Sequence, residues 1–453
     1  MSAPVASPTL GVEELDAVRV LQRALYRAAK ADPGRRFHAL YDKVHRRDVL
    51  ERAWGQVRRN AGAPGIDKIT ITDVVERYGV SRLLDELEAE LREGRFKPMP
   101  ARRVWIPKPG RQELRPLSIP AIRDRVVQAA LKIVIEPIFE ADMLPFSFGF
   151  RPKRAAHDAL QVVIDESFKG RRWVVETDIA DCFTAIPHDG LMSTLSERIS
   201  DRKVLALLHA FLRVGVMQDG AVRRSVSGTP QGGVISPMLC NAYLTRLDRA
   251  WRPAYGRLIR YADDLLAVCR IRGQAEAALA RLTVLLNGLG LEPKLAKTRI
   301  VHLVEGEPGF DFLGFHHRLV RSRPRRGANG LVYLARWPSQ RAVQHARERI
   351  KFLTMRARLV APVEQVVAEV NLFLRGFAGY FRFGNSASAF DKIRKYAVMR
   401  IALFVAKQHQ RGRSWGFAAA YRSPVSLGLV SLNGIVVAPR PNRSWRAPVE
   451  CRR

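Results

Sequence analysis

The chain has 453 residues, enough for two or three domains with a buried core, since domains commonly hold roughly 100–200 residues each. It carries 76 Lys and Arg against 43 Asp and Glu, and the net charge of +33 predicts a polyanionic partner. Because no apolar run reaches about 18 residues and the start lacks the order of a signal peptide, nucleic acid is favoured over a membrane.

The N-terminal region is expected to be helical. Apolar residues recur at helical spacing from about residue 12, a basic helix is expected at 41–59, and another helix includes 83–91 after a turn at 63–67. Residues 1–62 are therefore predicted to form a helical extension that leads into the next domain.

The middle of the chain mixes short apolar strands with helices, which favours an α+β domain over 63–317. Strands are predicted at 103–106, 173–178, 258–261, 265–269 and 299–304. Helices are predicted at 123–140, 154–168, 189–198, 202–213, 237–250 and 274–289.

The last part is strongly basic, with 26 Lys and Arg against five acids from residue 321 onward. Residues 318–338 are predicted to be a basic linker, because 321–330 read RSRPRRGANG. Amphipathic helices at 339–358, 363–382 and 387–409 predict a separate helical domain over 339–415. In the tail, 416–453, the Asn433-Gly434 pair predicts a short β-hairpin over 429–437.

Four cysteines, Cys182, Cys240, Cys269 and Cys451, form no CxxC pair and no plausible disulfide framework. We therefore expect a reduced, cytoplasmic protein.

Two adjacent acids stand between apolar strands at 258–268 (LIRYADDLLAV), so a tight hairpin would hold Asp263 and Asp264 at its tip. Such like charges persist mainly where a cation such as Mg²⁺ neutralises them, although a turn with exposed Asp residues is the plainer reading. A second strand ends in Asp178, 85 residues earlier. Carboxylates from adjacent strands would hold two metal ions suited to nucleotidyl transfer.

Residues 261–264 (YADD) and 178–183 (DIADCF) resemble motifs of the reverse transcriptases encoded by bacterial group II introns, the intron maturases. The resemblance implies a right-hand polymerase of fingers, palm and thumb. It makes Asp178, Asp263 and Asp264 the catalytic ligands of two Mg²⁺ ions, with Mn²⁺ as a substitute, and leaves Asp181 as a solvated turn acid. It also implies an RNA template, a DNA primer and deoxynucleoside triphosphates.

The same resemblance assigns nucleotide contacts. Lys108 and Arg115, in IPKPG (106–110) and LRPLSIP (114–120), would grip the triphosphate; the alternative is two cations on a solvated hairpin. Gln231, in SGTPQGG (227–233), would contact the nucleotide. Phe183 would close on C2′ of the sugar and favour deoxynucleotides, unless it is a core residue.

Nucleic-acid contacts follow in the same way. Arg151 lies in SFGFRP (147–152), and Lys297 lies in a stretch similar to the motif after YADD. Residues 371–377 (NLFLRGF) resemble the maturase-specific domain, which serves as thumb and binds structured intron RNA. Its contact residues are expected to include Arg375, Arg382 and Lys392.

Two other functions remain open from the sequence. One is a reverse transcriptase repurposed by its host for antiviral defence or for acquiring CRISPR spacers. The other is a non-catalytic RNA-binding splicing factor. Cleavage of target DNA by a nuclease domain is not expected, because Cys451 stands alone, and the sequence predicts no oligomeric state.

Overall fold

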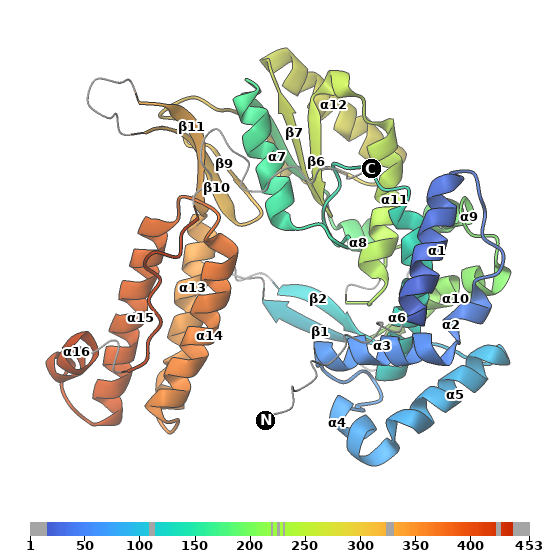
Figure 1. Cartoon of the computed structure of the whole chain (residues 1–453), viewed down its shortest axis with the longest axis horizontal. Coiled ribbons are helices and arrows are strands. Elements are labelled where there is room, and N and C mark those ends of the chain that lie inside the picture. Colours follow the sequence, from blue (N-terminus) through green and yellow to red (C-terminus); the bar gives the residue numbers. More distant parts are fainter. Residues whose placement is uncertain are drawn as a thin grey trace, which may run out of the picture.

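The computed structural model describes residues 16–107, 114–218, 221–223, 227–229, 232–322, 330–422 and 427–437. Helices and strands are mixed along these ranges, which confirms the α+β fold (Figure 1). None of the helices in these ranges has the length and apolar character needed to cross a membrane.

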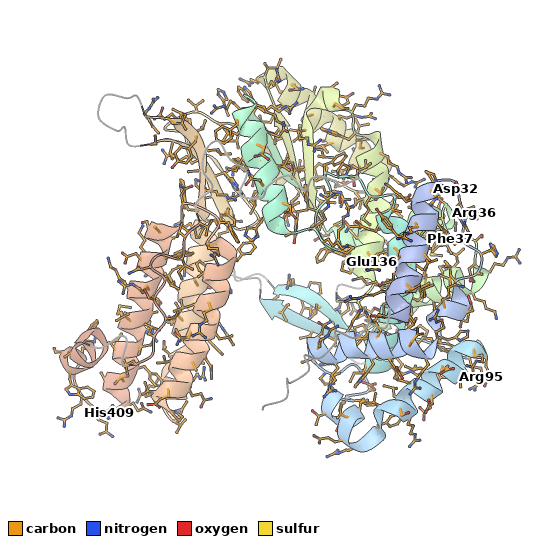
Figure 2. The ribbon with its side chains drawn as sticks, in the orientation of Figure 1. Asp32, Arg36, Phe37, Arg95, Glu136 and His409 are labelled. Carbon is orange, nitrogen blue, oxygen red and sulfur yellow. The ribbon has the colours of Figure 1, made fainter. Side chains whose placement is uncertain are left out.

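The N-terminal region is helical, as predicted. It contains α1 (Ala17–Ala31), α2 (Tyr41–Val44), α3 (Arg47–Asn60), α4 (Ile71–Asp73), a π-helical turn (Val74–Tyr78) and α5 (Val80–Arg92). Helices α1 and α3 pack on α6 (Ile122–Glu140), which is buried along most of its length. Phe37, labelled in Figure 2, connects this region to the palm, because its N–H donates to the Arg198 carbonyl (2.8 Å) and its carbonyl accepts from Ser200 (2.9 Å). The extension therefore shares one hydrophobic core with the domain that follows it.

The fingers contain a small sheet of strand order β2-β1-β4-β5. Strands β1 (Ala101–Pro107) and β2 (Leu114–Ile119) form an antiparallel hairpin, and β4 (Val216–Gln218) pairs with β1 and with β5 (Ala221–Arg223). In Figure 1 the β1–β2 hairpin (cyan) projects from the helices toward the C-terminal helices.

The palm is a four-stranded antiparallel sheet of order β6-β7-β3-β8. Its strands are β3 (Trp173–Asp178), β6 (Arg257–Tyr261), β7 (Asp264–Cys269) and β8 (Arg299–His302). Helix α7 (Ala156–Phe168) lies on one face and α12 (Arg272–Gly288) on the other. Because successive strand residues point to opposite faces, Val174 and Leu266 join one core while Val175 and Leu265 join the other. The sheet is thus buried on both sides.

Other helices of the palm region connect these strands. They are α8 (Cys182–Ala185), α9 (His188–Ser196), α10 (Arg202–Arg213) and α11 (Ser236–Ala250), with 3₁₀ turns at Pro253–Tyr255 and Leu295–Lys297. Helices α9, α10 and α11 agree with predicted helices within two residues at each end, whereas α8 and the 3₁₀ turns were not predicted.

The prediction of a linker over 318–338 is wrong for the described part of that range. Strand β10 (Phe315–Arg321) pairs antiparallel with β11 (Val332–Pro338) and with β9 (Phe310–Phe312), so a third sheet joins the palm to the C-terminal helices. The basic residues and the glycine of 323–329, which lie outside the described residues, favour a linker when the sequence is taken alone. The flanking strands are nevertheless held by an apolar face that includes Phe315 and Leu319.

The C-terminal domain is helical, as predicted, with α13 (Gln340–Leu353), a 3₁₀ turn (Arg356–Arg358), α14 (Val363–Phe381), α15 (Ala387–Gln408) and α16 (Arg413–Arg422). Leu372, at 73% exposure, does not join its core. The predicted β-hairpin at 429–437 is wrong for these residues, which form no strand. Their backbone is bonded to α14 instead, because Asn371 Nδ2 donates to the Gly428 carbonyl (2.7 Å) and Val430 N–H donates to Asn371 Oδ1 (2.8 Å).

Candidate active site

The backbone register of the palm brings the predicted carboxylates together. Strand β3 pairs with β7 so that Asp178 lies opposite Asp264. Asp263 stands in the β6–β7 turn next to Ala262, whose φ of 57° is left-handed. The Asp263 carbonyl accepts from the N–H of Ile179 (3.1 Å). Asp178 thus meets the two adjacent acids of the β6–β7 turn at one end of the central strands.

The electrostatics of this edge are those of crowded acids. Burial, followed by the charges of Asp178 and Asp263, raises the pKa of Asp264 to about 7. Burial and then Asp178 likewise raise the pKa of Asp263. Lys297, in the 3₁₀ turn after α12, forms an ion pair with the Asp178 carboxylate. A cation is therefore favourable at this position, and one ammonium already lies there.

The donor set fits a hard divalent cation, because Mg²⁺ prefers carboxylate oxygens and the repulsion that raises these pKa values would be relieved by it. Across the part of the chain that the structure describes, no three His, Cys, Asp or Glu side chains already converge on a common point as ligands. Metal binding through Asp178 would displace Lys297 from this carboxylate.

A groove of about 750 Å³ leads away from the carboxylates. It is lined by the palm strands, by the third sheet and by the first turns of α13. Its charged and ionisable residues are Glu176, Asp178, Asp264, Lys297, Arg299, Asp311, Arg341 and His345. Besides Asp178, which pairs with Lys297, two of the acids have cationic or imidazole partners: Arg299 pairs with Glu176 (2.7 Å) and His316 with Asp311 (2.7 Å). The groove thus joins the candidate metal ligands to the C-terminal domain.

Phe183 lies on α8, which begins directly after Asp181. Asp181 is exposed and left-handed (φ 42°), as expected for a turn acid. The Phe183 carbonyl accepts from the N–H of Thr229 (2.6 Å). A Cβ on Gly228 would lie 2.7 Å from the Thr184 Cα, so glycine lets residues 227–229 pack on α8. Phe183 is half-buried, and its role against the sugar stays a prediction.

The remaining nucleotide contacts are placed only in part. Arg115 is exposed on β2, at the edge of the fingers hairpin. Lys108 and Gln231 lie outside the described residues.

The predicted nucleic-acid contacts divide into two groups. Arg375 on α14 and Lys392 on α15 are exposed, while Arg382 is half-buried over the Phe383 ring. Lys297 lines the groove and forms an ion pair with Asp178, one of the candidate metal ligands. Their contacts with nucleic acid stay predictions.

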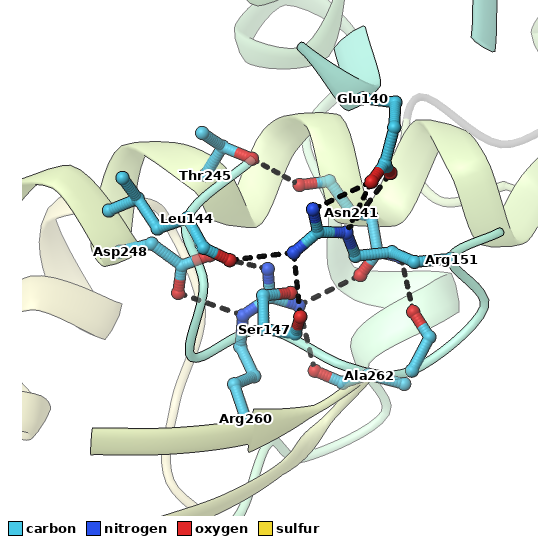
Figure 3. A network of polar contacts seen from close by, with 10 residues as sticks. Glu140, Leu144, Ser147, Arg151, Asn241, Thr245, Asp248, Arg260 and Ala262 are labelled. Carbon is cyan, nitrogen blue, oxygen red and sulfur yellow. Dashed lines mark hydrogen bonds and ion pairs between the residues drawn. The ribbon is translucent and has the colours of Figure 1, made fainter. Parts of the chain in front are cut away.

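Arg151 is placed differently from the expectation. It is 8% exposed, its guanidinium pairs with Glu140 (2.7 Å), and it donates to the carbonyls of Leu144 and Ser147 (both 2.6 Å). A contact with nucleic acid would require this pair to open. In this position Arg151 organises the loop before α7 (Figure 3).

Sequence reasoning missed a buried group beneath the β6–β7 turn, residues 261–264, which we name the catalytic turn after the role proposed for Asp263 and Asp264. Arg260 on β6, Asp248 and Asn241 on α11 are all buried, and Arg260 pairs with Asp248 at 2.5 Å (Figure 3). The available signal was the Arg itself, which interrupts the otherwise apolar strand before YADD.

Comparisons with known proteins agree with this arrangement. A family described as reverse transcriptase (RNA-dependent DNA polymerase) matches residues 106–317, and the group II intron maturase-specific domain matches residues 343–421. Protein YkfC of Escherichia coli K12 is 35% identical over 354 residues, which cover 69% of this chain and 91% of YkfC. Group II intron-encoded protein LtrA of Lactococcus lactis is 36% identical over 213 residues, which cover 47% of this chain but only 35% of LtrA. The chain therefore belongs to the family of reverse transcriptases encoded by group II introns, with a polymerase domain followed by a maturase-specific domain.

Proposed function

We propose that this chain extends a DNA primer on an RNA template with two Mg²⁺ ions, for which Mn²⁺ can substitute, held by Asp178, Asp263 and Asp264. The observation that carries the proposal is the β3–β7 register, which sets Asp178 opposite Asp264 next to the turn that carries Asp263. Family membership supports the reaction class. The raised pKa values of Asp263 and Asp264 support a cation at the site.

The chain's residues would divide the remaining work. When bound, the two ions favour the ionised primer 3′-hydroxyl and neutralise charge on the triphosphate. Arg115 and Lys108 would hold the triphosphate oxygens, and Gln231 would contact the nucleotide. Phe183 would exclude a ribose 2′-hydroxyl. Catalysis would then depend on positioning and charge stabilisation, as expected for phosphoryl and nucleotidyl transfer.

The groove is proposed to hold the template–primer duplex. It begins at the candidate metal ligands and reaches Arg341 and His345 on α13. Arg299 and Arg341 are suitable partners for backbone phosphates, and the acids that would repel them are paired with Arg299 or His316.

The C-terminal domain is proposed to bind structured intron RNA and to assist splicing. The maturase-specific match over 343–421 supports this role, and so does the surplus of 21 positive charges from residue 321 onward. Arg375 and Lys392 are the exposed cations that we assign to this contact, with Arg382 beside them in sequence.

The proposed location is the bacterial cytoplasm. Cys182 and Cys240 have sulfur atoms 3.4 Å apart in the palm core, and both are free thiols. Two neighbouring thiols are best maintained in a reducing compartment.

Primer extension tests the proposed polymerase. The purified chain should add dTMP to an oligo(dT) primer on poly(rA) when Mg²⁺ is present, and the Asp263→Asn variant should not. RNA binding by the same variant, measured in parallel, controls for folding. Equal synthesis by the variant would reject the metal assignment, whereas RNA binding without synthesis by the wild type would favour a non-catalytic splicing factor.

A further inference from the structure

A fully buried ion pair lies directly under the catalytic turn. Arg260 and Asp248 have side chains with 0% exposure, and the guanidinium binds the carboxylate through Nε (2.8 Å) and Nη2 (2.5 Å). The remaining nitrogen, Nη1, donates to Asn241 Oδ1 (2.8 Å) and to the Ala262 carbonyl (3.2 Å). Figure 3 shows these contacts converging from α11 on the end of β6.

Stability alone gives little reason for this pair. Replacing a buried ion pair by apolar residues of similar volume is often neutral or stabilising, because desolvating two charges is costly. Here burial opposes the charge on Arg260, yet the Asp248 carboxylate more than offsets this, and the pKa of Arg260 is raised. The guanidinium is therefore a fixed cation, and its one contact with the catalytic turn is the Ala262 carbonyl.

That carbonyl belongs to the peptide that leads into Asp263. Ala262 is left-handed (φ 57°), a conformation that is uncommon for a residue with a Cβ and that needs support from its surroundings. The Arg260 contact supplies this support on one side of the turn.

Asn241 supports the turn from a second side. Its Nδ2 donates to the Gly149 carbonyl (2.7 Å), and Gly149 lies so close to the turn that a Cβ there would be 2.4 Å from the Ala262 nitrogen. Residues 146–148 also pair with the free edge of β6, since Phe148 N–H donates to the Arg260 carbonyl (2.8 Å) and Arg260 N–H to the Phe146 carbonyl (2.9 Å). One side chain of α11 thus connects both flanks of the catalytic turn.

We propose that Arg260, held by Asp248 and Asn241, is a positioning residue that fixes the Ala262–Asp263 peptide and thereby the direction in which Asp263 presents its carboxylate. The inference rests on the proposed function and adds to it. Arg260 has no exposed surface and reaches the turn through the Ala262 carbonyl, so it acts through the turn and not by touching substrate.

The test compares variants that loosen this support without leaving an unpaired charge. Asn241→Leu keeps the Arg260–Asp248 pair and removes both amide contacts. Arg260→Lys keeps the positive charge and removes the guanidinium, which binds Asp248 through two nitrogens. We expect kcat for dTTP addition to fall about 10–100-fold, as for groups that orient a metal ligand, while the Kd for template–primer measured without Mg²⁺ stays unchanged.

A second readout does not depend on activity. Half-saturation of the protein by Mn²⁺, followed by electron paramagnetic resonance, should require a concentration several-fold higher in both variants, because Asp263 is no longer held in place. Should the wild-type chain fail to extend a primer, the proposed function fails, and the Mn²⁺ comparison still decides the role of Arg260.

Arg198 and Asp142 provide the matched control. The buried Arg198 pairs with the half-buried Asp142 (3.1 Å), and Arg198 donates to the carbonyls of Ala29 and Asp32, away from the catalytic turn. Arg198→Lys should lower stability while kcat and Mn²⁺ half-saturation per folded molecule stay at wild-type values. The inference is overturned if Asn241→Leu and Arg260→Lys also keep wild-type kcat and Mn²⁺ half-saturation. If Arg260→Lys fails to fold, wild-type values in Asn241→Leu alone overturn it.

Discussion

Asp178 and Asp264 lie directly opposite each other across the β3–β7 pair, although 85 residues lie between them in the sequence. Like charges in a cross-strand pair are destabilising, so this arrangement disfavours the metal-free protein. We expect Asp178→Asn and Asp264→Asn each to lower primer extension more than about 100-fold, because each removes a proposed metal ligand.

Asp264→Asn should not lower stability, although it lowers activity. The unfolding midpoint of Asp264→Asn in EDTA at pH 8 is expected at or above that of the wild type, because an amide removes the repulsion. Thermal unfolding followed by circular dichroism measures this. A strongly lowered midpoint would show that the acids are structural, and lost extension would then not report on metal binding.

The pH dependence of stability should reveal the raised pKa of Asp264. Burial, then Asp178 and Asp263, raise this pKa from 3.8 to about 7, so between these values the folded chain holds a proton that the unfolded chain has released. The contribution of Asp264 to the unfolding free energy therefore falls as pH rises from about 4 to about 7 and is constant above that. Urea unfolding in EDTA, with Asp264→Asn as the reference, should show the wild type losing stability relative to the variant over this window. A constant difference would contradict the shift.

Much of the palm follows from local patterns. The bounds predicted for the strand at 173–178 and the helix at 202–213 match β3 and α10, because buried strands and amphipathic helices carry their periodicity in the sequence. The three acids were identified from the YADD turn and the strand that ends in Asp178. Their meeting depends on one antiparallel register, which the intervening 85 residues permit but do not specify.

Other parts depend on long-range contacts that no local pattern contains. The basic residues between β10 and β11 concealed this strand pair. The backbone of 428–437 is hydrogen-bonded to Asn371 and Arg382 and does not pair as a hairpin. Arg151 was expected at the nucleic acid, but Glu140 pairs with it in the interior. A charged side chain in a sequence does not reveal whether its partner is a phosphate or a carboxylate.

A methyl group at Gly149 should displace the catalytic turn. The Cβ of Gly149→Ala would lie 2.4 Å from the Ala262 nitrogen and 2.9 Å from the Tyr261 carbonyl carbon, which is closer than backbone atoms tolerate. We expect kcat to fall at least about 10-fold, since misplacement of catalytic groups by roughly 1 Å can cost about 100-fold. Single-turnover extension with saturating template–primer measures the effect.

Gly55→Ala is the control for this substitution, because a Cβ at that position in α3 would meet no atom within 4 Å other than those of its chain neighbours and its own helix backbone. It should raise stability by about 0.5–1 kcal/mol and leave extension unchanged. Equal rates for the two variants would show that the turn has room to move.

Phe183 should determine the choice of sugar. In Phe183→Val the smaller side chain would leave space for a 2′-hydroxyl, and the ratio of kcat/KM for dTTP to that for UTP should fall roughly 10–200-fold. Phe211→Val, in the core at α10, is the control that loses packing without approaching the site. An unchanged ratio in Phe183→Val would assign Phe183 to the core, the alternative that its half-buried position leaves open.

The exposed cations of the C-terminal domain should set the salt dependence of RNA binding. Each Lys or Arg that neutralises a phosphate releases condensed counterions, so its removal should reduce the slope of log K against log salt by about 0.7–0.9. We expect Arg375→Glu and Lys392→Glu to weaken binding of the cognate intron RNA and to reduce this slope. Arg272→Glu, on the exposed surface of α12, should leave the slope nearly unchanged.

If all three variants weaken binding equally, the RNA responds to net charge, and the C-terminal domain is not its specific site. If only the first two do so, while extension of a short primer on poly(rA) remains, RNA recognition and polymerisation are separable in this chain.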